Sequence, residues 1–404
     1  MTPAVPDSRF PIPDSRFRAA MPGKFSLNAR AAASGALLLL AACASAAASG
    51  SDATAAPAAV ARSASATNWL YVCNQNDASV SVIDMSTNRV VRTIDLTKLG
   101  FSANAKPHHI AVEPDGSHWY VTLIGDGKIV KFDRDDHVVA EAMFETPGML
   151  ALHPTQDVMY VGRSMTAVNP PQRIGVVQRS TMAIEELGVF FPRPHAMVVA
   201  PSTGTVYTAS LAVNQMAAVD ASSENVQLKN VEGPQHALMQ FALSPDGRTL
   251  AASAELSARV LFFDLSDPLQ PTQTASVPVG AQPFDPVYTP DGRWVYLGNK
   301  AANTITIIDA ATKQVAKTLS GEGIAQPHGA VVSPDGRFVY ISNNNLSDAG
   351  HAMHGAAPAP AAAQPAPAKP AGTGTVVVID TGTQEIVSVI PVGHNASGMG
   401  AASR

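Results

Sequence analysis

The stretch "QPHGAVVSPDGRFVYISNN", residues 326–344, decides the fold because similar stretches recur along the chain. Related stretches are "KPHHIAVEPDGSHWYVT" at 106–122, "RPHAMVVAPSTGTVYTAS" at 193–210 and "QPFDPVYTPDGRWVYLGN" at 282–299. Each has Pro as its second residue, continues through an apolar run and a turn, and ends in a run of aromatic and β-branched residues. The sequence is therefore a repeat array with a period of about 45 residues, a length typical of one small sheet per repeat.

Each repeat predicts four strands, which we call a, b, c and d. A Pro-Asp-Gly turn separates a from b at 114–116, 245–247, 290–292 and 334–336. Pro fixes φ, Asp bonds its own backbone and Gly accepts positive φ. The c strands, such as "ITIID" and "VVVID", alternate with period two and are rich in Val, Ile and Thr. Helical periodicity with caps is missing, which disfavours a parallel βαβ architecture.

The number of repeats predicts the architecture. Seven b–c–d sets are expected to start near Trp69, Trp119, Met159, Val206, Leu250, Trp294 and Val339. Six a strands are expected to start near His108, Gly148, His195, Leu238, Phe284 and His328. The tail "HNASGMGAAS" can supply the missing a strand of the first set, so that no sheet edge is left open. The prediction is an all-β, seven-bladed β-propeller of four-stranded antiparallel blades, its first blade closed by the C-terminal strand.

Three segments carry a resemblance to a known family. Tyr71-Val72-Cys73-Asn74, Tyr296-Leu297-Gly298-Asn299 and Tyr340-Ile341-Ser342-Asn343 are each followed by a strand that ends in Ile-Asp. This pattern resembles the YVTN family of β-propeller repeats, over roughly residues 68–402. The resemblance implies the propeller fold and kinship with lactonases and with the haem propeller of cytochrome-type nitrite reductase. It implies no particular activity, because propellers host many unrelated ones.

The N-terminus reads as an export signal. "GALLLLAAC" follows Lys24 and Arg30, and its apolar run is too short to span a bilayer. Leu40–Cys43 resembles the bacterial lipobox, which implies cleavage before Cys43 and a lipid on that cysteine; the alternative is a plain export signal with a chance Cys. "PDSRF" occurs twice before Met21, so Met21 is the expected start.

These features divide the chain into three parts. Residues 1–42 are expected to be an extension and signal peptide, 43–67 a flexible Ala/Ser-rich tether, and 68–404 the propeller. The expected location is the periplasm or the outer membrane, with the protein held to the membrane by lipid. Cys73 then has no cysteine partner, and its place in an apolar strand predicts a buried small side chain.

Charge excludes one class of partner. The whole chain has a net charge of −5. Removing residues 1–42 removes five basic and two acidic residues, which leaves 22 basic and 30 acidic residues and a net charge of −8. An acidic surface does not attract polyanions, so nucleic-acid binding is not expected.

Histidines recur at one place in the repeat. Alignment on the turn proline puts His108, His195 and His328 at equivalent positions directly after a proline. The same register gives Gly148, Phe284, Leu238 with His236 nearby, and about Ser397 with His394 nearby; His109 is adjacent to His108. In a propeller these positions crowd one mouth of the central channel, away from the core. Neutral imidazoles there suit a transition metal.

A long b–c insertion in the seventh repeat, residues 346–373, hangs over the same mouth. It contains His351, Met353 and His354 before an Ala/Pro-rich half. Imidazole with thioether favours copper over hard cations. The alternative is a solvated low-complexity insert, and likewise the repeated histidines are either ligands or loop residues copied by descent.

Three functions follow as hypotheses. The first is an exported, lipid-anchored scaffold that binds a transition metal, a cofactor or a protein partner at the His-rich mouth. The second is an enzyme on the same face, either a lactonase-like hydrolase or a cofactor-dependent redox protein, to which Glu113, Glu255 or Asp285 could contribute a carboxylate. The third is protein–protein interaction alone. The sequence lacks Gly-x-Ser-x-Gly, His-Glu-x-x-His and Cys-x-x-Cys-His, so no catalytic residue is assigned.

Overall fold

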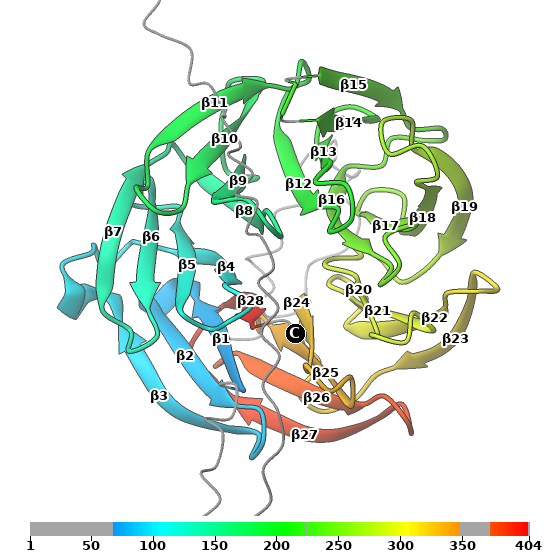
Figure 1. The fold of residues 1–404 in the computed structure, drawn as a ribbon. Helices are drawn as coiled ribbons and strands as arrows, with labels where there is room; N and C mark the ends of the chain where they lie inside the picture. The colour runs from blue at the N-terminus through cyan, green and yellow to red at the C-terminus, as the bar shows by residue number, and fades with distance from the viewer. Residues whose placement is uncertain (1–67, 221, 224, 347–371, 403–404) are drawn as a thin grey trace, which may run out of the picture. The chain divides into compact units, whose positions relative to one another are not determined.

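The computed structural model describes residues 68–220, 222–223, 225–346 and 372–402. Within them the chain forms seven four-stranded antiparallel sheets. The predicted seven-bladed propeller is confirmed, and Figure 1 shows the blades arranged around a central axis. The predicted signal peptide, Cys43, the tether, and His351, Met353 and His354 lie outside the described residues.

Four rings of strands make up the propeller. The inner strands are β28 (Ala396–Ala401), β4 (Pro107–Val112), β8 (Pro147–Leu152), β12 (Pro194–Val199), β16 (Leu238–Leu243), β20 (Val287–Tyr288) and β24 (Pro327–Val332). The second strands are β1 (Trp69–Asn74), β5 (His118–Leu123), β9 (Val158–Arg163), β13 (Val206–Ser210), β17 (Thr249–Ala254), β21 (Trp294–Asn299) and β25 (Phe338–Asn343).

The other two rings lie outside these. The third strands are β2 (Ser79–Asp84), β6 (Lys128–Asp133), β10 (Arg173–Gln178), β14 (Gln215–Asp220), β18 (Arg259–Asp264), β22 (Thr304–Asp309) and β26 (Thr375–Asp380). The outer strands are β3 (Arg89–Asp95), β7 (Val138–Met143), β11 (Ile184–Gly188), β15 (Asn225–Asn230), β19 (Thr272–Pro278), β23 (Gln314–Leu319) and β27 (Glu385–Pro391). Two short 3₁₀ helices, η1 (Gln75–Asp77) and η2 (Leu96–Leu99), lie in loops. In the described part of the chain no helix has the length and apolarity to cross a membrane.

The ring closes between the two ends of the described chain. β28 pairs antiparallel with β1 in the first sheet, with Tyr71 opposite Gly400 and Val72 opposite Met399. β28 also contacts the neighbouring inner strands β4 and β24. The C-terminal strand therefore completes the first blade, as the sequence predicts, and the first sheet gains its innermost strand.

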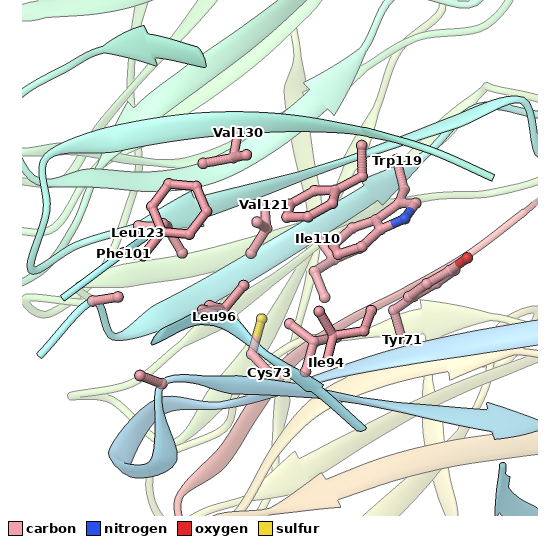
Figure 2. Packing of buried hydrophobic residues seen from close by; sticks show 14 of the residues in the cluster. Tyr71, Cys73, Ile94, Leu96, Phe101, Ile110, Trp119, Val121, Leu123 and Val130 are labelled. Atoms are coloured by element: carbon pink, nitrogen blue, oxygen red, sulfur yellow. The ribbon is translucent and has the colours of Figure 1, made fainter. Parts of the chain in front are cut away.

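Apolar clusters between neighbouring blades hold the sheets together. Figure 2 shows the cluster of the first two blades, in which Tyr71 and Cys73 of β1 face Trp119 and Val121 of β5. Trp119 stacks on Phe132 at 4.0 Å and on Tyr71 at 4.7 Å between ring centroids. Cys73 is free and fully buried, as expected, and burial raises the pKa of its thiol well above its usual range.

The asparagine that ends the family motif has a structural role. Asn74 donates from Nδ2 to Ser79 Oγ at 3.0 Å and Ser81 Oγ at 2.9 Å, and it accepts from the Gly393 amide at 3.0 Å. Asn299 makes the same two donations, to Thr304 and Thr306. In these two blades the asparagine thus ties the second strand to the third, and in the first blade it also holds the chain entering β28. Asn343 instead donates to the Ile341 carbonyl of its own strand.

The sixth blade departs from the predicted pattern. Its inner strand β20 spans only Val287–Tyr288, and Pro283 joins Asn299 by an isolated bridge. Pro286 lies between them and has no N–H to give to a ladder, so the strand cannot form where the repeat would start it.

Candidate functional site: the histidine mouth

One end of the inner ring is built from two equivalent positions in every blade. The residue before each inner strand, or before the Pro283 bridge in the sixth blade, has a left-handed backbone with φ between 44° and 57°. These residues are Lys106, Thr146, Arg193, Ala237, Gln282, Gln326 and Asn395. The carbonyl of each accepts the N–H of the residue that follows the second strand: Ile124, Ser164, Leu211, Glu255, Lys300, Asn344 and Gln75, respectively. Non-glycine residues rarely hold this conformation, and it recurs here at all seven entrances to the inner strands.

A second equivalent position lies two residues further along the chain. It is the second residue of each inner strand or, in the sixth blade, its equivalent. Around the ring it is occupied by Ser397, His108, Gly148, His195, Met239, Phe284 and His328. We call this set, together with the residue before each inner strand and the residue after each second strand, the histidine mouth. The predicted register is confirmed except in the fifth blade: Leu238 pairs with Ala254 as Pro107 pairs with Leu123, so Met239, not Leu238, is equivalent to His108.

The mouth brings three sequence-distant imidazoles together. The His108 ring centroid lies 6.4 Å from that of His195 and 6.1 Å from that of His328. The three residues are only 4%, 3% and 7% exposed. The prediction that they meet is confirmed, but the expectation that they lie away from buried structure is wrong, because the crowded inner strands bury them.

Burial keeps these imidazoles neutral. It holds the pKa of His108 well below its usual range, and the neighbouring His195 lowers it further. Burial also lowers the pKa of His328, with Lys300 and His108 adding to the effect. Neutral rings keep one nitrogen with a lone pair and one with a proton, so each can accept at one position and donate at the other.

Hydrogen bonds orient two of the rings. His195 Nδ1 donates to the Met239 carbonyl at 2.8 Å, which leaves the lone pair on Nε2. The Gln75 amide Nε2 lies 2.9 Å from His108 Nδ1, which makes Nδ1 the acceptor and puts the proton on Nε2. His108 Nε2 and His328 Nδ1 are buried and have no hydrogen-bond partner among the described residues.

Other buried polar atoms at the mouth share this condition. Arg193 Nε, Thr146 Oγ1, Asn344 Oδ1 and Ser397 Oγ also lack a partner within the described residues. Buried polar groups are usually paired with protein or water. Their concentration at one end of the ring therefore indicates a place for a polar ligand or ordered water.

The other predicted histidines lie apart from the three. His236 uses both ring nitrogens, with Ser257 Oγ at 2.7 Å and the Glu232 carbonyl at 2.8 Å. His394 pairs with Asp77 at 2.9 Å in a partly exposed loop. Within the described residues no ring contact joins either to the cluster.

His109 lies nearer the cluster. Its Nδ1 accepts the Leu150 amide at 3.2 Å. Burial, followed by the charge of His195, lowers its pKa to about 4.

The three candidate carboxylates do not lie at the same end of the propeller. Glu113 lies at the opposite end of β4, where it accepts from Tyr120 at 2.9 Å and pairs with Arg179 at 2.6 Å, so it does not face the mouth. Glu255 and Asp285 do belong to the mouth's blades. Burial raises the pKa of Glu255, and it raises the pKa of Asp285 to about 7.

Sequence reasoning missed Arg193 and Lys300. Lys300 directly follows the Tyr-Leu-Gly-Asn motif, as Gln75 follows Tyr-Val-Cys-Asn. Its ammonium group lies 5.0 Å above the Phe284 ring, and Phe284 packs at 4.6 Å from His328. Aligning the repeats on this motif as well as on the turn proline would have found the position.

A surface groove of about 670 Å³ lies elsewhere, at the Pro-Asp-Gly turns of the sixth and seventh blades. Asp291 and Asp335 line it, and each accepts the amide of the second residue after it, as the sequence predicts for turn carboxylates. Their side chains are thus engaged within their own turns.

The mouth does not form a metal centre as it stands. No group of three or more His, Cys, Asp or Glu side chains in the described ranges is arranged to hold an ion. Metal–nitrogen bonds of about 2.0–2.1 Å would place tetrahedral imidazole centroids about 5 Å apart. The observed 6.1–6.4 Å separations are about 1 Å wider. Ligation also needs Gln75 to turn its amide oxygen to His108 Nδ1–H.

Comparison with known proteins agrees with this fold. The family model described as "Lactonase, 7-bladed beta-propeller" matches residues 189–352. No curated protein of similar sequence was found.

Similar solved structures include a functionally unknown protein of Desulfotomaculum acetoxidans, with 13% identity, TM-score 0.61 and coverage of 82% of this chain and 98% of that one. The Kuenenia stuttgartiensis hydrazine synthase has 20% identity, TM-score 0.57 and coverage of 74% and 90%. The dihydro-haem d1 dehydrogenase NirN in complex with DHE has 16% identity, TM-score 0.54 and coverage of 83% and 76%. The chain is thus a seven-bladed β-propeller, similar to lactonase-type propellers over residues 189–352 and in fold to a haem-related one.

Proposed function

We propose that this protein is a binding scaffold whose histidine mouth holds a transition-metal ion. The observation that carries the proposal is the convergence of His108, His195 and His328, with buried nitrogens of His108 and His328 that have no partner in the described part of the chain. Neutral imidazole suits copper, zinc, iron and nickel. His195 already has the arrangement common among metal ligands, since its Nδ1–H is bonded to a carbonyl and its Nε2 is a lone-pair donor.

Metal titration tests this proposal. We expect the protein to bind about one equivalent of Zn²⁺ or copper by calorimetry after treatment with chelator. His328→Gln should weaken binding at least roughly tenfold, the loss found even for residues that only support a ligand. His236→Gln is the matched control, because His236 is also buried but uses both nitrogens within its own blade. Unchanged affinity in His328→Gln, or no binding at all, would contradict the metal site.

A hydrolase is the second candidate, and the match to the lactonase model favours it. In this candidate Glu255 takes a proton from a water that attacks the lactone carbonyl carbon. The ring ester C–O bond then breaks, and Glu255 returns the proton to the leaving alkoxide oxygen. A general base works best with a pKa near the working pH. Burial raises the pKa of Glu255 in that direction. Glu255→Gln should abolish lactone hydrolysis if the candidate is right, and a wild-type protein inactive on a panel of lactones would exclude it.

Attachment to the cell envelope remains a prediction from the sequence. Cys43→Ala should move the protein from the membrane fraction to the soluble fraction if Cys43 carries lipid, as the lipobox resemblance implies. Continued membrane association of this variant would favour another anchor or partner.

A further inference from the structure

Two cations and one carboxylate occupy neighbouring blades of the histidine mouth. Arg193 enters the fourth blade, Glu255 follows the second strand of the fifth, and Lys300 follows the second strand of the sixth. Arg193 and Lys300 are both partly buried, and Glu255 is 5% exposed. A third cation, Lys106 at the entrance of the second blade, is exposed, and the other residues at these positions are neutral.

One carboxylate accompanies the two cations, and its charge acts on both. Among the described ion pairs, none joins Glu255 to Arg193 or to Lys300, and its Oε1 accepts from the Gln282 amide at 3.1 Å. Arg193 donates from Nη2 to the Met165 carbonyl, which carries no formal charge, and its Nε has no partner among the described residues. Burial raises the pKa of Glu255, whereas the charges of Lys300 and Arg193 lower it. The two cations therefore share a single carboxylate.

The mouth is therefore locally positive in a protein whose net charge is −5. Two partly buried cations that share one carboxylate leave an excess positive charge, which is costly to bury, and an anionic ligand relieves that cost. Donors are already in place, since His108 Nε2 carries a proton in the observed orientation of Gln75. Lys300 lies on the Phe284 ring, which itself contacts His328, so the ammonium group and the imidazoles border one region.

We propose that the histidine mouth binds a small organic anion through a carboxylate group, held by Lys300 and Arg193 and by the proton on His108 Nε2. Charged hydrogen bonds of this kind are short and strong, and Arg and Lys are the side chains that supply them. This site does not depend on the metal ion proposed above. If an ion is bound, His108 Nε2 loses its proton, and Lys300 and Arg193 remain as the partners of a carboxylate that offsets the charge of the ion.

Calorimetry with metal-free protein tests the inference, with sodium succinate as the probe and inorganic phosphate as a second probe at fixed ionic strength. We expect saturable succinate binding that Lys300→Gln weakens about tenfold or more, the size of a lost charged hydrogen bond. Lys106→Gln is the matched control, because Lys106 is an exposed cation at the entrance of the second blade. Its substitution should change the affinity less than about twofold if only general electrostatics is altered.

Several outcomes would overturn the inference. Absence of saturable succinate binding contradicts it, as does an equal loss in Lys106→Gln and Lys300→Gln. Binding of phosphate without succinate contradicts the carboxylate class. If Lys300→Gln does not fold, Arg193→Gln provides the same comparison. Lys300→Gln should keep its Zn²⁺ affinity whereas His328→Gln should lose it, so failure of the metal site and failure of the anion site are distinguishable.

Discussion

Asp285 belongs to the inner wall of the sixth blade, one residue beyond Phe284. Burial raises the pKa of its carboxyl group to about 7, against a usual value of 3.8. The folded protein therefore holds a proton at Asp285 between about pH 4 and pH 7 that the unfolded chain releases. Because the native state binds more protons in that range, this group makes the folded state less stable as the pH rises through it.

Asp285→Asn should remove that penalty. The free energy of unfolding of the variant minus that of the wild type should be larger at pH 8 than at pH 5 by roughly 2 kcal/mol, since one pKa unit is worth about 1.4 kcal/mol. Urea unfolding at the two pH values measures the difference. The buried neutral histidines act in the opposite sense, because their pKa values are lowered, but they are common to both proteins and cancel.

Asp246→Asn is the control for this comparison. Its carboxylate accepts from Ser244 Oγ and the Arg248 amide, and these bonds lower its pKa. Its contribution is therefore already complete at pH 5, and substitution should change stability equally at pH 5 and pH 8. A pH-independent difference for Asp285→Asn as well would contradict the raised pKa.

Single positions show where sequence reasoning works. His108, His195 and His328 each follow a proline at a fixed spacing from a turn, so an alignment of the repeats shows that they are equivalent. Lys300 and Arg193 stand at positions that differ in chemistry from blade to blade, so repetition does not mark them. Their burial, and the excess of two cations over one carboxylate, depend on the residues that neighbouring blades place beside them.

The inner strands show a regularity that the sequence hides. In β4, β8, β16 and β24 the pairing register shifts after the first residue, which is a β-bulge. The bulge frees the amide of the third residue, and a hydroxyl on the second strand accepts it, as Thr122 does for His109 and Ser342 does for Gly329. Period-two alternation predicts a strand but does not predict a bulge, so only the strand could be foreseen.

Gly398 lies where β28 approaches β4 closely. A Cβ atom there would overlap the carbonyl oxygen of His108 and lie 2.9 Å from the Cα of His109. We expect Gly398→Ala to lower the free energy of unfolding by about 1–3 kcal/mol, because backbone must shift to admit the methyl group. The same shift should displace His108, so ligand affinity at the mouth should fall with it.

Gly188→Ala supplies the comparison in an outer strand. A Cβ at Gly188 meets nothing closer than the Phe190 ring at 3.5 Å, which is ordinary contact. Its effect on the urea midpoint should be small. Equal destabilisation by the two substitutions would show that the closeness of β28 and β4 is not the cause.

At the scale of the whole molecule, the seven-blade count and the closure by the C-terminus follow from counting strands. Six inner strands for seven b–c–d sets leave one vacancy, and a ring of sheets has no other strand to fill it. The contents of the mouth could not be counted in this way. They follow from the order of blades around the ring, which brings His328 beside His108 only because β28 stands between β24 and β4.

Removal of β28 should therefore damage both the ring and the site. A chain that ends at Pro391 exposes the free edge of β1 and the apolar residues that Ala396 and Met399 cover. We expect a lower thermal midpoint by circular dichroism and self-association in size-exclusion chromatography. A chain that ends at Ala402 keeps β28 and should behave as the wild type. A synthetic peptide of residues 392–402 should raise the midpoint of the shortened chain, because it can pair with β1 in trans. If the shortened chain unfolds at the wild-type temperature and stays monomeric, closure by the C-terminal strand does not stabilise the propeller.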